Sequence, residues 1–218
     1  MSLFASLFRD FRRTASDLPG LFSGYFCVMF LPLAPLLGDE ATLPGYYSDQ
    51  TYFCRLRETH TGPLAPYRCK KHLKNSRCLI LELDGLGSFV FTNHYHSALF
   101  QNLQRRFPGV TSYVFCSDGP GGYFKILKDG RIQRKIASYM FFEGMGSYAE
   151  TRGAPCAYEL ETGHIFKVDP KARHLREMMP DFTKREVLNL FDYYVGLDRF
   201  QSEALRRTLV YDLESPNT

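Results

Sequence analysis

The dipeptide Asp129-Gly130 constrains the fold of this chain more than any other feature. Two alternating runs flank it directly, Tyr123–Lys128 (YFKILK) and Arg131–Ser138 (RIQRKIAS). Asp-Gly between such runs is a strong hairpin signal, because both turn positions tolerate positive φ. The sequence therefore predicts a tight β-hairpin. We expect Ile132 and Ile136 on one face, with one face of the hairpin in the core and the other toward solvent or a partner.

Other apolar runs also predict strands. The 218 residues include 19 Phe and 14 Tyr, and both residue types favour strands. Arg77–Asp84 and Ser88–Thr92 are separated by a short glycine-bearing turn, which predicts a second hairpin. The remaining expected strands are Tyr25–Leu31, Thr51–Arg57, Thr111–Cys116 and Ala157–Leu160. The glycine-rich stretch 141–154 is expected to be a loop.

Helical spacing occurs in four places. It is found in Ser2–Arg13, in Ser97–Phe107, after the capping box of Thr183 and Glu186, and from Asp198 or Ser202 through Arg207. A chain of this length commonly forms a single domain. The expected fold is a single α+β domain over residues 1–218. Its sheet is largely antiparallel and twisted, with an N-terminal helix, one mid-chain helix and two C-terminal helices.

The uncharged run Leu21–Leu37 follows three arginines near the N-terminus. Pro32 and Pro35 interrupt it, and it is short for a transmembrane helix. No small-x-small cleavage site follows it, so a signal peptide is not favoured. We expect a buried strand and turn, with no membrane contact. The six cysteines form no C-x-x-C motif, and four of them lie in apolar, strand-like runs, where free cysteine is often buried as a small hydrophobic residue. This favours a reduced, cytoplasmic protein, although an even count leaves room for disulfides after export.

His94 and His96 are the sharpest metal candidates. On a strand, positions i and i+2 point the same way, so both imidazoles could reach one ion. A third ligand would have to come from Glu82, Asp84 or His72, and the sequence does not place any of them. Polar residues are also expected at the junction between a strand and a helix, which explains the two histidines without a metal. We therefore predict no metal and no cofactor.

Catalytic motifs are weak elsewhere. Cys116 stands at a strand end, where His94 or His164 could act as its base, with Asp118 close by in sequence. Glu82 and Asp84 alternate on one strand and could act as paired acids. A small metal- or cysteine-dependent hydrolase or transferase around His94, His96 and Cys116 is therefore kept as an alternative. The favoured interpretation is a protein that is not an enzyme.

The stretch Arg55–Arg77 concentrates positive charge. It holds seven basic residues and one acid, whereas the whole chain carries +4. Such a segment can attract nucleic acid. RNA and DNA modules usually interleave aromatics with these charges, yet only Tyr67 does so here. A nucleic-acid-binding module using Arg55–Arg77 is an alternative, and a solvated loop is favoured.

The region 123–161 carries one family resemblance. It contains the K-D-G-R turn at Lys128–Arg131, Arg134, a glycine-bearing loop with Gly144, and R-G-x-P-x-x-Y-E at Arg152–Glu159. This order resembles bacterial immunity proteins of polymorphic or secreted toxin systems. The resemblance implies an α+β protein without enzymatic activity that binds and neutralises one cognate toxin or effector protein.

An inhibitor of this kind binds through exposed aromatic and arginine anchors. By residue type we predict a partner-binding set of Arg134, Tyr139, Glu143, Tyr148 and Arg152. The positive net charge favours a toxin that is not a nuclease, or an acidic one, because nuclease inhibitors face basic targets. No small-molecule cofactor and no membrane partner are expected, and nucleic acid is not favoured.

Overall fold

The structure, a computed structural model, describes residues 26–33, 37–44, 51–61, 77–93, 98–118, 121–140, 147–172, 178–179, 182, 184–197 and 205–214. In these ranges the chain forms ten strands. They are β1 (Phe26–Leu31), β2 (Glu40–Pro44), β3 (Thr51–Thr61), β4 (Arg77–Leu83), β5 (Gly87–Asn93), β6 (Thr111–Asp118), β7 (Gly121–Lys128), β8 (Arg131–Met140), β9 (Ser147–Arg152) and β10 (Leu205–Glu214). The described helices are α3 (Ala98–Arg105), α4 (Ala157–Thr162) and α6 (Lys184–Val195).

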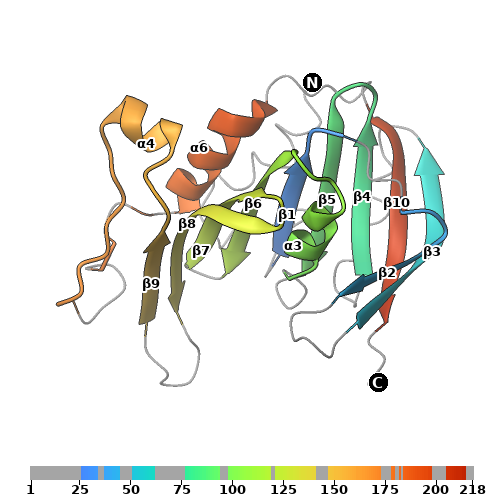
Figure 1. Ribbon diagram of the computed structural model, residues 1–218, viewed down its shortest axis with the longest axis horizontal. Helices are drawn as coiled ribbons and strands as arrows, with labels where there is room; N and C mark the ends of the chain where they lie inside the picture. The colour runs from blue at the N-terminus through green and yellow to red at the C-terminus, as the bar shows by residue number, and fades with distance from the viewer. Residues whose placement is uncertain are drawn as a thin grey trace, which may run out of the picture.

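All ten strands join one antiparallel sheet in the order β2-β3-β10-β4-β5-β1-β6-β7-β8-β9 (Figure 1). β2 and β9 are therefore the two edges. β10, the last strand in the chain, lies between β3 and β4. The C-terminal segment is thus an integral part of the sheet.

The predicted fold class, α+β with four helices, is wrong: the described residues form mainly antiparallel sheet with three short helices. The helix predicted through Arg207 overlaps strand β10. Ala157–Leu160, predicted as a strand, begins α4, and 147–152, predicted as loop, forms β9. The mid-chain helix and the first C-terminal helix are confirmed as α3 and α6. Ser2–Arg13 lies outside the described residues.

Each face of the sheet carries its own apolar core. On one face, here called the α6 face, Val187, Leu188 and Phe191 of α6 pack on the sheet. On the other, the α3 face, Leu99, Phe100 and Leu103 of α3 do the same. Strands buried on both faces need continuous apolar runs. β1 (FCVMFL) is such a run, and its residues from Cys27 to Leu31 are at most 2% exposed. It confirms the strand predicted at Tyr25–Leu31.

The hairpin at Asp129-Gly130 is confirmed. Both turn residues have positive φ, 52° and 66°, and β7 pairs with β8. A bulge at Gln133 then shifts the register, because Ile126 pairs with Arg134 and Leu127 with Ile132. The expectation that Ile132 and Ile136 share a face is therefore wrong. Ile132 packs on the α3 face and Ile136 lies in the core of the α6 face.

Helix α3 is fixed to the turn of this hairpin. The amide of Gly130 donates to the side chain of Gln104, and Gln104 donates to the carbonyl of Val110 at 2.6 Å. The amide of Gly109 donates to Asp129 Oδ1 at 2.7 Å. These bonds satisfy backbone groups of the segment after α3 and of the hairpin turn, and they tie α3 to the turn end of β7 and β8.

Cys27 of β1 and Cys116 of β6 lie directly opposite each other and form a disulfide. The expectation of six reduced cysteines is therefore corrected for this pair. Cys54, Cys78 and Cys156 are free and buried. No helix in the described ranges is long and apolar enough to cross a membrane.

Candidate functional site

The five predicted partner-binding residues are found in different environments. Tyr148 and Arg152 lie on edge strand β9 and are exposed, Tyr148 to 40%. Tyr139 lies on β8, opposite Tyr148 in the register. Arg134 is 4% exposed and therefore lies in the interior. Glu143 lies outside the described residues. Only part of the predicted set is thus brought together on one accessible strand.

Arg134 makes a buried ion pair with Glu159 of α4. Its Nε donates to Oε2 at 2.8 Å and its Nη2 donates to Oε1 at 2.5 Å. The same carboxylate also accepts from the amides of Cys156 at 2.9 Å and Phe166 at 3.1 Å. Arg134 further donates to the carbonyl of Gly153 at 2.9 Å. Both charged groups are therefore satisfied by the protein itself, as a buried pair requires.

This ion pair gives the R-G-x-P-x-x-Y-E segment a structural role. Gly153 has a φ of +85°, and a Cβ there would overlap the carbonyl oxygen of Gln133, the bulge residue of β8. The chain thus passes close to the backbone of β8 before Cys156 caps α4 and Glu159 binds Arg134. The residues that carry the family resemblance hold α4 on the α6 face.

The α3 face of β7, β8 and β9 carries a row of cations. Lys125 pairs with Lys135 in the register, and Lys135 pairs with Arg152, so three positive side chains occupy adjacent positions on three strands. One acid joins them: Glu150 accepts a hydrogen bond from Lys135. We call Lys125, Lys135 and Arg152 the cation row. Sequence reasoning missed Lys125 and Lys135, because the bulge at Gln133 sets which residues of β8 stand beside Lys125.

Lys125 is the unusual member of the cation row. It is partly buried, and its Nζ lies 4.0 Å from the centroid of the Tyr123 ring, a cation–π contact. Burial, together with the like charge of Lys135 and opposed by Glu150, lowers the pKa of Lys125 to about 8. No carboxylate among the described residues forms an ion pair with it.

Tyr148 and Glu150 complete this surface. Lys135 Nζ lies 5.9 Å from the centroid of the Tyr148 ring. Burial raises the pKa of Glu150, but hydrogen bonds from Lys135 and Tyr148 outweigh it, so the net pKa is lowered. Glu150 is therefore a carboxylate near neutral pH, and it compensates one of the three charges in the cation row.

A second exposed apolar area lies on the two helices of the α6 face. Leu160 of α4 is 65% exposed and Tyr193 of α6 is 42% exposed. Tyr193 meets Tyr158 edge-on, with 5.4 Å between ring centroids, and Tyr158 donates to Glu186 at 3.0 Å. These contacts bind α4 to α6.

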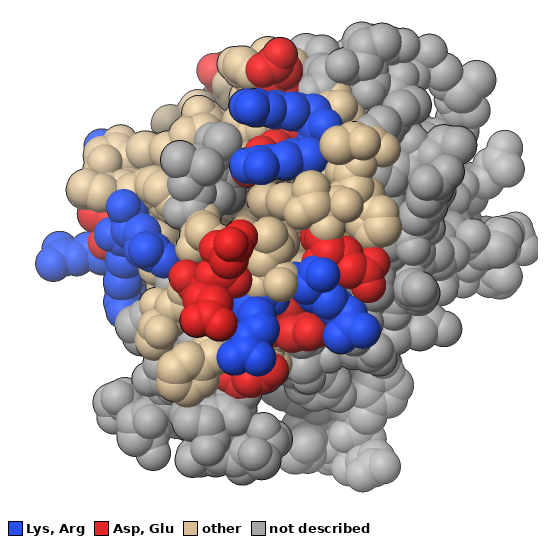
Figure 2. Space-filling model, turned by 90° about the vertical axis from the view of Figure 1, so that its right-hand side faces the viewer, with Lys and Arg blue, Asp and Glu red and all other residues tan. Residues whose placement is uncertain are grey.

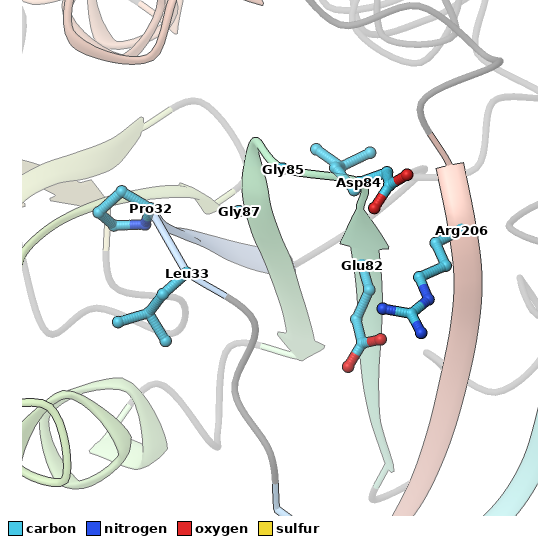
Figure 3. A pocket seen from close by; sticks show the side chains of 8 residues that line it. Pro32, Leu33, Glu82, Asp84, Gly85, Gly87 and Arg206 are labelled. Carbon is cyan, nitrogen blue, oxygen red and sulfur yellow. The ribbon is translucent and has the colours of Figure 1, made fainter.

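Glu82 and Asp84, the predicted pair of acids, line an open depression of about 240 Å³ at the turn between β4 and β5 (Figure 3). Glu82 is buried and bonded by the guanidinium of Arg207. Asp84 lies in the exposed turn. Arg206 also lines the depression. A carboxylate already held by an arginine is a poor general acid or base, so this geometry does not favour hydrolysis.

The basic stretch is described at its two ends, over residues 55–61 and at Arg77. Arg55 bonds Glu40 at 3.2 Å, and Arg57 bonds Glu58 at 3.3 Å and Asp212 at 3.2 Å. Figure 2 shows this side of the molecule, where positive and negative side chains alternate. Paired charges of both signs make a weak field for nucleic acid. Residues 62–76, with most of the stretch, lie outside the described residues.

The cysteine and histidine candidates find no support in the described ranges. Cys116 is bonded to Cys27 and has no thiolate to offer. Burial raises the pKa of the Cys54 thiol to about 11, against an opposing effect of Arg106. His164 is exposed and stacks edge-on against Phe166. His72, His94 and His96 lie outside the described residues. No cluster of three metal-ligating side chains occurs in the part of the chain that is described.

Comparisons with known proteins give no relative: no family model, no curated protein and no solved structure matches the chain.

Proposed function

We propose that this protein is a binding protein of the immunity type, which neutralises a cognate toxin or effector by protein–protein contact. The observation that carries the proposal is the α3 face at the β9 edge. There Tyr148 and Arg152 are both exposed, Tyr148 beside the cation row and Arg152 as one of its members, and both are residue types that dominate binding energy at interfaces. Tyr139 is opposite Tyr148 in the register, but its side chain lies outside the described part of the structure.

The position of β9 supports the same proposal. β9 ends the sheet, so one side of its backbone has no strand beside it among the described residues. An edge strand can pair with an extended segment of another protein, and side chains on alternate positions then give specificity. Tyr148, Glu150 and Arg152 are such alternate positions. A partner that pairs with β9 would therefore meet all three.

The charge of the surface limits the class of partner. The cation row outnumbers its single acid, so a partner with an acidic surface is favoured. A nuclease is not favoured as the partner, because its surface is strongly basic. A toxin that is not a nuclease therefore fits the proposal. We also propose a cytoplasmic location, where full burial of Cys27 and Cys116 would protect their disulfide from cellular thiols.

The test is rescue of growth. Genes adjoining this one in the source genome are expressed singly in a bacterial host, with and without the protein. We expect one of them to be toxic and its toxicity to be relieved by stoichiometric binding. Tyr148→Ala should weaken both rescue and binding by tenfold or more, the loss expected at an interface anchor.

Phe53→Ala provides the matched control. Phe53 is 46% exposed and lies on β3, near the opposite edge of the sheet, so its loss should leave rescue unchanged. Absence of rescue by the wild-type protein against every adjoining gene product would overturn the proposal. Turnover of a substrate, abolished by a substitution in the His94 region, would favour the hydrolase alternative instead.

A further inference from the structure

The cation row is an unbalanced charge cluster. Lys125, Lys135 and Arg152 stand in register on three adjacent strands, and like charges directly opposite each other on a sheet destabilise it. Glu150 compensates one charge through Lys135. The remaining positive charge lies on the partly buried ammonium of Lys125 and the exposed guanidinium of Arg152.

Burial makes the imbalance costly at Lys125. Removing an ammonium from water without an anionic partner is unfavourable, and a ring face compensates only part of that cost. The β6 neighbour of Lys125 is Val114, which is apolar and buried. Among the described residues, the charged groups that act on Lys125 are Lys135 and Glu150, and the ring of Tyr123 lies against its Nζ. An anion placed at this point would meet two donors of different geometry, an ammonium and, across Lys135, a planar guanidinium.

We propose that the cation row is a carboxylate-binding site, in which an acidic side chain of the partner protein lies between Lys125 and Arg152, beside the ring of Tyr148. The identity of the partner rests on the proposed function. The site itself is inferred from the register of β7, β8 and β9, independently of that function. The partner segment is acidic and extended, so that it follows β9 while one Glu or Asp reaches inward to Lys125.

A protein carboxylate fits the site better than the phosphates of a nucleic acid. A phosphodiester chain needs a track of cations along its length. The cation row holds three cations and ends at β9 on one side and at Val114 on the other, so it is too short to be such a track. One carboxylate needs only the two donors that Lys125 and Arg152 supply.

Lys125 also gives the site a measurable response to pH. Because its pKa is lowered to about 8, a fraction of the free protein carries a neutral amine in mildly alkaline solution. A bound carboxylate favours the ammonium, so binding takes up protons near pH 8 and weakens as the pH rises above it.

The experiment uses a fluorescein-labelled peptide of alternating Glu and Gly, its Gln/Gly counterpart, and a single-stranded oligonucleotide of equal charge. Anisotropy titrations at low salt should show binding of the Glu peptide and none of the Gln peptide. Lys125→Met and Arg152→Gln should each weaken binding about tenfold, as loss of a charge-assisted hydrogen bond predicts. Lys128→Met is the control, since Lys128 is an exposed lysine on the same strand that points to the other face.

Three results would overturn the inference: equal binding of the two peptides, unchanged binding by both Lys125→Met and Arg152→Gln, or tighter binding of the oligonucleotide. Circular dichroism of each variant separates lost binding from lost folding, and removal of a buried ammonium should not unfold the protein. Growth rescue reports separately on the proposed function. Rescue without peptide binding counts against the carboxylate site alone. Peptide binding without rescue supports the site and counts against the toxin partner.

Discussion

The guanidinium of Arg134 and the carboxylate of Glu159 face each other in a buried bidentate pair, with nitrogen–oxygen distances of 2.8 and 2.5 Å. They are 25 residues apart and join β8 to α4. Glu159 is completely buried and accepts two further backbone hydrogen bonds. The pair therefore fixes the segment that follows the β9 edge, and with it the position of Arg152.

Glu159→Gln should lower the free energy of unfolding by about 3–5 kcal/mol, because it leaves Arg134 as an uncompensated buried charge. Urea unfolding followed by circular dichroism measures the difference. Glu161→Gln is the control: Glu161 lies two residues away on α4 and is exposed, so its change should stay within about 0.5 kcal/mol. Equal effects of the two variants would show that the ion pair contributes nothing specific.

The Arg134–Glu159 pair should also make the protein acid-sensitive. Burial raises the pKa of Glu159, but hydrogen bonds from Arg134 and the Cys156 amide outweigh it and hold the pKa below its usual value of 4.5. A lowered carboxyl pKa stabilises the fold above pH 4.5, and this stability is lost as the pH falls through the folded-state value. The difference in unfolding free energy between wild type and Glu159→Gln should therefore shrink below pH 4.5. A difference that is constant between pH 7 and pH 3 would contradict this.

Gly153→Ala should destabilise the protein more than Gly163→Ala. Both glycines have positive φ, 85° and 70°, so both substitutions incur about 1–2 kcal/mol of left-handed strain. At Gly163 a Cβ meets nothing within 4 Å, whereas at Gly153 it overlaps the carbonyl of Gln133. Overpacking there adds about 1–3 kcal/mol. Urea midpoints of the two variants test the order, and equal midpoints would show that β8 yields to the new methyl group.

Local chemistry predicted the parts of the fold that depend on neighbouring residues. Asp129-Gly130 specifies its own turn, and a continuous apolar run such as β1 can only be buried. The wrong predictions concern segments whose secondary structure is determined by contacts with residues distant in sequence. Leu205 and Leu209 fit a helical spacing, but pairing with β3 and β4 makes this segment a central strand. Thr208, Val210 and Tyr211 are of types that favour strands, but the prediction from helical spacing gave them too little weight.

The candidate surface divides in the same way. Tyr148 and Arg152 were predicted by residue type and are exposed on β9. Arg134 was predicted for the same reason, but it is buried, because it forms an interior ion pair with Glu159. The cation row forms because a single-residue bulge at Gln133 places Lys135 opposite Lys125. The sequence of β8 does not indicate this bulge. Residue type alone therefore does not predict a surface whose residues are brought together by the register of three strands.

Reduction of the Cys27–Cys116 disulfide should lower the free energy of unfolding by about 2–4 kcal/mol. The bond closes a loop with a sequence separation of 89 residues, and long loops gain the most from a crosslink. Unfolding in urea with and without a phosphine reductant measures the effect. The double variant Cys27→Ala/Cys116→Ala should show no response to the reductant. Alkylation of denatured, unreduced protein should leave both cysteines unlabelled by mass spectrometry, and labelling of either would contradict the bond.

Lys125→Met should raise the free energy of unfolding at pH 7. Burial and Lys135 lower the pKa of Lys125 from 10.5 to about 8, so the folded protein binds this proton less tightly than the unfolded chain does. The resulting penalty is complete below pH 8 and fades as the pH rises from 8 toward 10.5. The advantage of Lys125→Met over wild type should therefore be largest at pH 7 and smaller at pH 10. Lys128→Met, which removes an exposed lysine from the same strand, corrects for net charge. An advantage that is absent at pH 7, or that grows with pH, would show that the ammonium of Lys125 is well solvated or compensated, and the reason for an anion at the cation row would disappear.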